Sequence, residues 1–343
     1  MQHQRKSIVK KALLAALPVI GLVTPILASA DVNVYSYRQQ FLTDPIFDAF
    51  TAETGIKVNT VFAKKGLIER LESEGMNSPA DLLLVTNVGN LAAAVDAGIT
   101  QSVSNEVLEN NIPASLRDVD GHWFGLTSRG RIIVTSRDRI EEGLVSSYAD
   151  LAKPELAGKI CTRSGKHSYM VELIASVIAH DGEAAATDWL TAVKGNLARK
   201  PQGNDRAQVK AISEGECDVA VINTYYMGKM LTTAEQIPWA ASVNVVFPNQ
   251  DDRGTHMNIS GVVMTKASPN KNEAIQLMEF LAGDAAQGMY AEKNHEYPVK
   301  PDVSPSSLVS SWGEFKQDDL SLNEIAKYRA QASKLVDTVD YDG

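Results

Sequence analysis

Strand-like and helix-like segments alternate over residues 32–98, and this alternation constrains the fold more than any other feature of the sequence. Apolar runs typical of strands cover residues 32–37, 57–62 and 81–85. Helical periodicity follows each of them, at residues 45–55, 65–74 and 91–97. Repeated strand–helix–strand units place parallel strands in a sheet that helices cover on both faces. The sequence therefore predicts an α/β fold.

The remainder of the chain predicts a second lobe. Strands are expected at residues 131–135, 156–161, 217–223 and 256–264, and helices at 168–180, 184–194, 272–281 and 322–335. The 313 residues after residue 30 exceed the size at which one core usually keeps growing. We expect a first lobe of residues 31–130 with 255–300 and a second lobe of residues 131–254 with 301–343. Chain crossings at 131–135 and after the loop 249–254 would form a hinge.

Residues 1–30 have the pattern of a cleaved signal peptide. A basic start precedes an apolar run over residues 12–27, and Ala28, Ser29 and Ala30 supply the small residues before a cleavage point. The apolar run has 16 residues, whereas a membrane span needs about 20. We expect cleavage before Asp31, which places a soluble mature chain in the periplasm.

The mature chain is acidic, because the leader takes away four basic residues and no acidic ones. It keeps 42 Asp and Glu against 29 Lys and Arg. Such a surface repels nucleic acid and anionic lipid and attracts cations. We expect no nucleic-acid partner, and we expect a monomer.

Cys161 and Cys217 are the two cysteines of the chain. In an oxidising compartment a lone pair is more often a disulfide than a metal or redox site, and their separation excludes a Cys-x-x-Cys motif. We predict a Cys161–Cys217 bridge.

Motifs of common enzymes are absent from the sequence, which has no Gly-x-Ser-x-Gly, His-Glu-x-x-His, phosphate loop or dinucleotide fingerprint. The six histidines are scattered, and most carboxylates fall on polar faces of predicted helices. We therefore expect no enzymatic activity.

Tyrosines follow two of the predicted strands. Tyr225 and Tyr226 come after the apolar strand at 218–222, and Tyr169 opens a helix after the strand and loop at 159–167. Open α/β sheets place their ligand sites at this carboxyl edge. If Cys161 and Cys217 are bridged, the two strands are neighbours and the three phenols can converge. The alternative is that the tyrosines only pack on loops.

Three converging phenols suit ferric iron. Fe(III) is a small, hard trication that prefers anionic oxygen donors, and three phenolates would cancel its charge. A free tyrosine titrates near pH 10, so binding must displace protons and acid should release the metal.

Four stretches resemble the ferric-iron-binding periplasmic proteins of ABC transporters. They are Tyr35-Ser36-Tyr37-Arg38, residues 125–131, Cys161-Thr162-Arg163-Ser164 with Tyr169, and residues 215–226. The resemblance spans essentially the whole mature chain. The tyrosine pair after its strand and the upstream cysteine are specific to the iron branch, whereas the two-lobe outline is shared with binders of sulfate, polyamines and thiamine.

This resemblance implies a type II periplasmic binding protein, in which each lobe is a mixed, mostly parallel sheet flanked by helices and two strands form the hinge. It also implies an inner-membrane ABC permease as partner. Tyr169, Tyr225 and Tyr226 would bind Fe(III) from the second lobe. Arg129 matches the family arginine that holds carbonate or another synergistic anion beside the iron, with Arg131 as the weaker candidate. The alternative for either arginine is a surface ion pair.

The first lobe departs from the family pattern. Many members have a His-Tyr pair just after the first-lobe Ser-x-Arg, and here those positions are Gln39 and Gln40. Glutamine offers at most a neutral carbonyl oxygen. The first-lobe ligand is therefore expected to be Gln40, Gln39, or only a water or anion, with Tyr37 as an outside candidate. This leaves the coordination number and the preference for Fe(III) over Fe(II) open.

A second hypothesis keeps the two-lobed binder but gives it a small organic ligand or an oxyanion, of the polyamine, sulfate or thiamine type. Arg129, Arg131 and helix N-termini would hold such a ligand.

Overall fold

The computed structural model describes residues 30–343, in which the strands form one mixed sheet. The predicted signal peptide, except for Ala30, lies outside the described residues. The sheet order is β2-β1-β3-β8-β4-β6-β5, and β7 and β9 also pair with β4. The strands are β1 Val32–Ser36, β2 Val58–Phe62, β3 Leu82–Thr86, β4 Phe124–Ser136, β5 Ile160–Cys161, β6 Val219–Asn223, β7 Val243–Val246, β8 Met257–Met264 and β9 Tyr297–Pro298.

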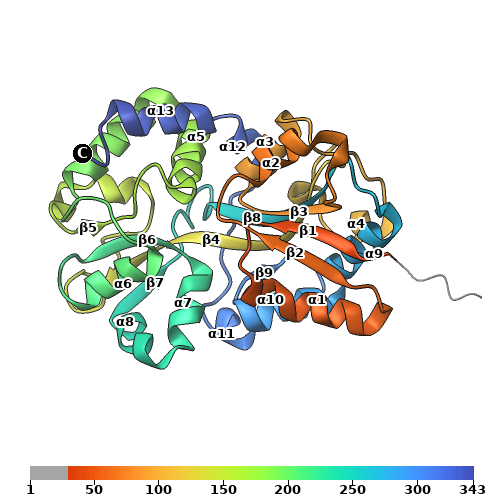
Figure 1. Ribbon diagram of the computed structural model, residues 1–343. Helices are drawn as coiled ribbons and strands as arrows, with labels where there is room; N and C mark the ends of the chain where they lie inside the picture. The colour runs from red at the N-terminus through yellow and green to blue at the C-terminus, as the bar shows by residue number, and fades with distance from the viewer. Residues whose placement is uncertain (1–29) are drawn as a thin grey trace, which may run out of the picture.

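Helices cover both faces of this sheet (Figure 1). They are α1 Gln40–Thr54, α2 Leu67–Glu74, α3 Val88–Asp96, α4 Glu106–Asn111, α5 Ser168–Gly195, α6 Asp205–Ser213, α7 Thr224–Leu231, α8 Ile237–Ala241, α9 Lys271–Ala282, α10 Asp284–Asn294, α11 Ser307–Ser310, α12 Leu322–Ala326 and α13 Arg329–Thr338. The predicted α/β class is confirmed. Among residues 30–343, no helix has the length and apolar content that crossing a bilayer requires.

Strand β4 joins the two halves of the sheet and crosses the middle of the molecule (Figure 1). Up to Gly130 it pairs with β8, and from Arg131 it pairs with β6. The chain returns alongside it, because the backbone N–H of Arg131 donates to the carbonyl of His256 at 2.9 Å. We call β1, β2, β3 and β8 the first strand group, and β5, β6 and β7 the second strand group. The two groups are linked by paired chain crossings.

Alternating side chains explain why both faces of the first strand group are covered. Leu82 and Leu84 belong to a core cluster with helices α1 and α9, whereas Leu83 and Val85 point into a different cluster. All four side chains have no exposed surface. Burying a side chain of this size fully stabilises the fold by roughly 1.5–3 kcal/mol. Strands β1, β2 and β3 are parallel, as predicted, while β8 and β4 add antiparallel pairings.

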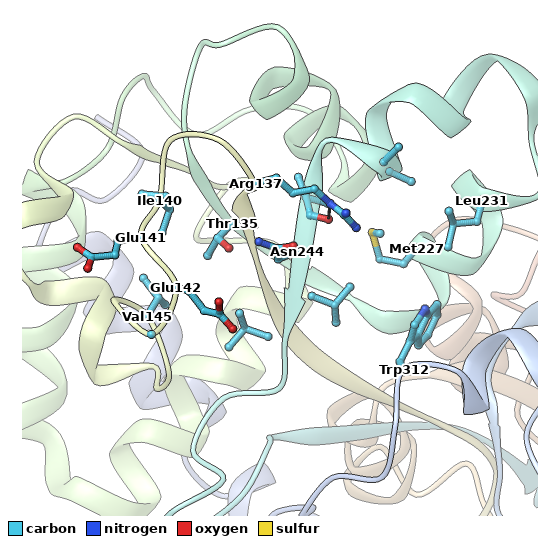
Figure 2. Close-up of a pocket in the computed structure, with 16 residues that line it drawn as sticks. Thr135, Arg137, Ile140, Glu141, Glu142, Val145, Met227, Leu231, Asn244 and Trp312 are labelled. Atoms are coloured by element: carbon cyan, nitrogen blue, oxygen red, sulfur yellow. Dashed lines mark hydrogen bonds between the residues drawn. The ribbon is translucent and has the colours of Figure 1, made fainter.

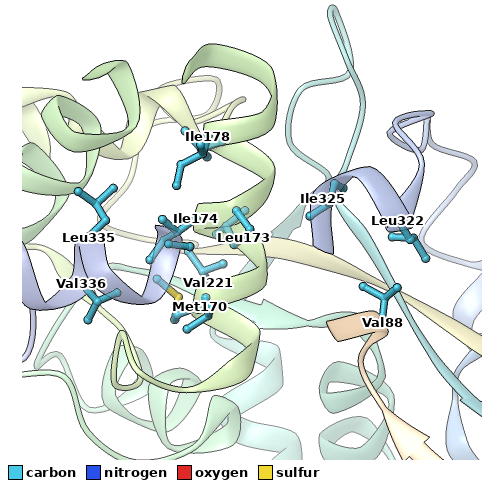
Figure 3. Packing of buried hydrophobic residues seen from close by; sticks show 14 of the residues in the cluster. Val88, Met170, Leu173, Ile174, Ile178, Val221, Leu322, Ile325, Leu335 and Val336 are labelled. Atoms are coloured by element: carbon cyan, nitrogen blue, oxygen red, sulfur yellow. The ribbon is translucent and has the colours of Figure 1, made fainter. Parts of the chain in front are cut away.

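The C-terminal segment packs on elements of both groups. Helix α13 packs on α5, and Leu335 and Val336 share a buried cluster with Ile174 and Leu173 of α5 (Figure 3). Helix α12 contacts α3 and α5. The single helix predicted at residues 322–335 is wrong, because the chain turns between α12 and α13 to reach these two surfaces.

The second strand group holds the cysteines. Strands β5 and β6 are parallel neighbours, with Cys161 opposite Ala220. The predicted disulfide is confirmed, since Cys161 and Cys217 are bonded with their Cα atoms 5.9 Å apart. The strand predicted at 156–161 is shorter than expected, because a 3-10 turn at Pro154–Leu156 and Gly158, with φ of 70°, precede it. Helix α5 is interrupted at Gly182, near the predicted break between two helices.

Candidate functional site

Three tyrosines meet at the carboxyl ends of β5 and β6. Tyr225 and Tyr226 lie in the first turn of α7, directly after β6, and Tyr169 is the second residue of α5. The hydroxyl oxygens of Tyr169 and Tyr225 are 3.1 Å apart. The ring centroids of Tyr225 and Tyr226 are 4.3 Å apart. Parallel pairing of β5 with β6 therefore brings together side chains that are 56 residues apart in the sequence.

The tyrosines line a cavity of about 370 Å³ between the two strand groups. Thr86 and Ser260 contribute from the first group. All three tyrosines are partly exposed, and all three line this cavity. A packing role alone does not explain phenols that face a shared cavity.

Burial makes two of the phenols harder to ionise than a free tyrosine. It raises the pKa of Tyr225 well above the ordinary value of 10.0, and the neighbouring Tyr169 and Tyr226 raise it further. Burial also raises the pKa of Tyr226, with Tyr169 and Asp205 adding to the effect. A cation that binds these oxygens as phenolates must therefore displace their protons.

The N-terminus of α5 is held by His167. Its Nδ1 accepts a hydrogen bond from the backbone N–H of Tyr169 at 3.2 Å, and the two rings meet edge to face at 4.5 Å. Burial and the charge of Arg163 lower the pKa of His167 to about 4. The imidazole is therefore neutral and can accept this bond, which fixes the start of the helix that carries Tyr169.

Three guanidinium groups surround the ring of Tyr169. The central carbons of Arg129, Arg131 and Arg163 lie 5.8, 5.7 and 4.9 Å from the ring centroid. Asp205 accepts hydrogen bonds from Arg131 at 2.8 Å and from Arg163 at 2.9 Å. This buried carboxylate offsets part of the positive charge behind the tyrosine.

The two candidate anion-binding arginines lie in different surroundings. Arg129 lines the cavity, and its guanidinium donates to Ser260 at 3.1 Å and to the side-chain oxygen of Asn87. Its Nε has no partner. Arg131 lies behind the cavity wall and is bound to Asp205 and Asn223. Of the two, only Arg129 therefore faces the cavity, and within the described residues no carboxylate hydrogen-bonds to its guanidinium. The buried carboxylate of Glu172 acts on it electrostatically.

The first strand group contributes Gln39 and Tyr37 to the cavity wall. Gln40 is exposed at the start of α1 and is not part of this wall. The hydroxyl of Tyr37 accepts hydrogen bonds from the backbone N–H groups of Leu67 and Ile68, at 2.9 and 3.0 Å. The phenol of Tyr37 is thus engaged at the start of α2.

Sequence analysis missed an ion pair in the cavity wall. Arg38 binds Glu296 through both carboxylate oxygens, at 3.2 and 2.6 Å, and Thr127 also donates to Glu296 at 3.0 Å. Both charged side chains are almost fully buried. The residues are 258 positions apart and both have polar neighbours in the sequence, so no local pattern suggested the pair. Arg206 and Lys229 were also missed, and they add positive charge to the wall.

A larger cavity of about 660 Å³ lies elsewhere, between β7, α7 and α8 (Figure 2). Glu142, Asn244 and Trp312 are among its lining residues, and it contains no tyrosine. Among residues 30–343, no group of three or more His, Cys, Asp or Glu side chains is placed to hold a metal ion. The phenol-lined cavity is therefore the candidate site.

Comparison with known proteins finds relatives that agree with one another. The family model for bacterial extracellular solute-binding proteins matches residues 77–312. Iron uptake protein A1 of Synechocystis sp. is 43% identical over 309 residues, covering 89% of this chain and 86% of that protein. Such relatives are iron-binding and iron uptake proteins and not enzymes.

Solved structures show the same fold. The apo ferric ion-binding protein A of Pasteurella haemolytica superposes with a TM-score of 0.88 at 51% identity, covering 91% of this chain and 98% of that one. The Trichodesmium protein in complex with iron and citrate superposes with a TM-score of 0.86 at 40% identity, covering 91% and 100%. These neighbours are two-lobed ferric-binding proteins, and the predicted two-lobed architecture is confirmed.

Proposed function

Because the chain belongs to the bacterial extracellular solute-binding protein family, we propose that it captures Fe(III) in the periplasm and delivers it to an inner-membrane ABC importer. Residues 31–130 with 255–300 form one lobe, and residues 131–254 with 301–343 form the other. The change of partner along β4 between Gly130 and Arg131 supports this division. The iron binds in the cavity between the lobes.

Tyr169, Tyr225 and Tyr226 bind the iron as phenolates. The observation that carries this proposal is the 3.1 Å between the hydroxyl oxygens of Tyr169 and Tyr225. A small octahedral cation with bonds of about 2.0–2.1 Å to oxygen holds adjacent ligand oxygens about 2.9 Å apart. The two oxygens therefore already have nearly the spacing that one shared ion requires. Three phenolates would then balance the charge of Fe(III).

Arg129 holds an anion beside the iron. Its hydrogen-bond partners Ser260 and Asn87 are neutral, so within the described residues no carboxylate occupies its N–H groups. Carbonate or a carboxylate would pair with it. Arg38, Arg206 and Lys229 line the same cavity, and the volume of about 370 Å³ leaves room for an anion with the ion. Arg131 acts behind the wall through Asp205.

The first lobe contributes through Gln39, the glutamine that lines the cavity. Gln40 and Gln39 stand where the family pattern has its His-Tyr pair, and Gln39 lies in the cavity wall. A neutral amide oxygen adds no charge to the site. The anion and the three phenolates therefore supply most of the negative charge that the iron meets.

Iron titration tests this function. Adding ferric citrate to the metal-free protein should give a visible phenolate-to-iron charge-transfer band that saturates at one iron per chain. A protein that stays colourless and leaves the iron with citrate would contradict the proposal. The alternative cargo, a small organic ligand or oxyanion, predicts instead that citrate, sulfate or spermidine raises the unfolding temperature without iron.

A further inference from the structure

We propose that Asn87 is a positioning residue for the iron site, because its side-chain amide couples Arg129 to the helix that carries Tyr169. This inference rests on the proposed function, in which Tyr169 binds iron and Arg129 binds the accompanying anion. Nothing in the sequence pattern marked this asparagine, which lies in the turn between β3 and α3.

The amide of Asn87 contacts both sides of the cleft. Its Nδ2 donates to the hydroxyl of Ser168 at 2.7 Å, and its Oδ1 accepts from Nη2 of Arg129. Ser168 begins α5 and directly precedes Tyr169. The side chain of Asn87 is buried, with a relative exposure of 1%. One amide thus connects the turn after β3 to Arg129 of β4 and to the first residue of α5.

The backbone of Asn87 indicates that the side chain is retained for these contacts. Its φ of 78° and ψ of 138° lie in a region that glycine enters easily and residues with a Cβ do not. The side chain makes no capping hydrogen bond to α3. Asn90 instead ties this turn, by donating to the carbonyl of Thr86 at 2.8 Å. Since glycine would suit the turn better, the turn itself does not require an asparagine.

The hydrogen bonds of Arg129 explain how a bound anion would act on Tyr169. Asn87 and Ser260 fix two of its terminal N–H groups, while Nε remains without a partner. An anion that binds the guanidinium of Arg129 therefore binds a side chain that is already hydrogen-bonded to Asn87. Any shift of Arg129 is passed to Ser168 and hence to Tyr169. The anion and the iron therefore influence each other's retention through Asn87 as well as by direct contact.

Asn87→Gly separates this role from a structural one. It removes the amide and relieves the backbone strain, which offsets part of the cost of the lost hydrogen bonds, so the metal-free variant should stay folded and unfold within a few degrees of the wild type. Loss of a hydrogen bond to a charged group should make EDTA strip the iron roughly tenfold faster or more, followed by loss of the visible band. Ser168→Ala, which removes only the bond to α5, should speed release by about threefold to tenfold.

Asn90→Ala is the matched control, because it removes an amide whose hydrogen bond, to the carbonyl of Thr86, stays within the same turn. It should release iron at the wild-type rate. Wild-type release from Asn87→Gly would overturn the proposal, and so would a metal-free variant that no longer folds cooperatively, which would indicate a purely structural role.

A metal-free measurement keeps this test separate from the iron hypothesis. Amide hydrogen exchange in residues 168–172 should be faster in Asn87→Gly and Ser168→Ala than in the wild type and in Asn90→Ala. Equal exchange in all four proteins would overturn the coupling even if iron binds. A wild type that takes up no iron, with the exchange difference present, would contradict the proposed cargo and leave the coupling supported.

Discussion

Asp205 and Arg131 form a buried ion pair, 2.8 Å between carboxylate and guanidinium, directly behind the tyrosine site. The same carboxylate also binds Arg163 at 2.9 Å and accepts a hydrogen bond from the backbone N–H of Asn223, the residue before α7. A single carboxylate thus joins the start of α7 to two arginines that contact the ring of Tyr169. We expect the proposed iron site to depend on this internal charge balance.

Asp205→Asn should lower the free energy of unfolding by about 3–5 kcal/mol, because it leaves two buried guanidinium groups without a carboxylate. Chemical denaturation of the metal-free protein measures this. Asp337→Asn is the control, since the pair of Asp337 with Lys166 is exposed on both sides and should be worth less than about 1 kcal/mol. Equal effects of the two variants would contradict the role given to Asp205.

His167 should make the metal-free protein less stable in mild acid. Its pKa falls from 6.5 to about 4 on folding, so the unfolded chain binds the proton more readily. The contribution of His167 to stability is therefore present above pH 6.5 and is lost as the pH falls toward 4. His167→Asn keeps an acceptor for the N–H of Tyr169 and removes this titration. Unfolding temperatures between pH 7 and 4 should fall less steeply in the variant, and parallel curves would contradict the assignment.

The disulfide should stabilise both the fold and the site. Replacing Cys161 and Cys217 together with serine reopens a loop of 56 residues and should cost about 2–4 kcal/mol. Since the bridge ties β5 to β6, the variant should also bind iron more weakly. Denaturation and competition with citrate measure the two effects. Reduced wild-type protein is the control and should match the variant; full stability and affinity without the bridge would contradict this account.

Iron binding should depend steeply on pH. Each phenol must lose a proton to bind, and burial raises the pKa of Tyr225 and Tyr226. Below those pKa values, the logarithm of the apparent binding constant should rise by about three per pH unit for three phenolates. Tyr226→Phe should reduce this slope to about two. Competition against a chelator, corrected for its own protonation, measures both slopes, and identical slopes would exclude Tyr226 as a phenolate ligand.

Local patterns predicted much of this structure. Apolar runs and helical periodicity placed β1, β2 and β3 with their helices, and the pair of cysteines correctly indicated the neighbouring strands β5 and β6. From that neighbour relation we predicted that Tyr169 and Tyr225 converge. In the structure their hydroxyl oxygens are 3.1 Å apart.

Long-range features could not be predicted in this way. The apolar pattern of β4 does not reveal that its partner changes from β8 to β6, because both halves are equally buried. The Arg38–Glu296 pair and the contacts of Asn87 join residues that are far apart in the sequence, and no local periodicity links them. The break between α12 and α13 is set by packing on α3 and α5.

The central claim is that Tyr169, Tyr225 and Tyr226 share one Fe(III) ion, and iron titration of phenylalanine variants tests it most directly. Each single variant should keep a shifted, weaker visible band. The triple variant should stay colourless and bind no iron, while Tyr328→Phe, outside the cavity, should behave as the wild type. A triple variant that still takes up one iron with the wild-type band would contradict the account.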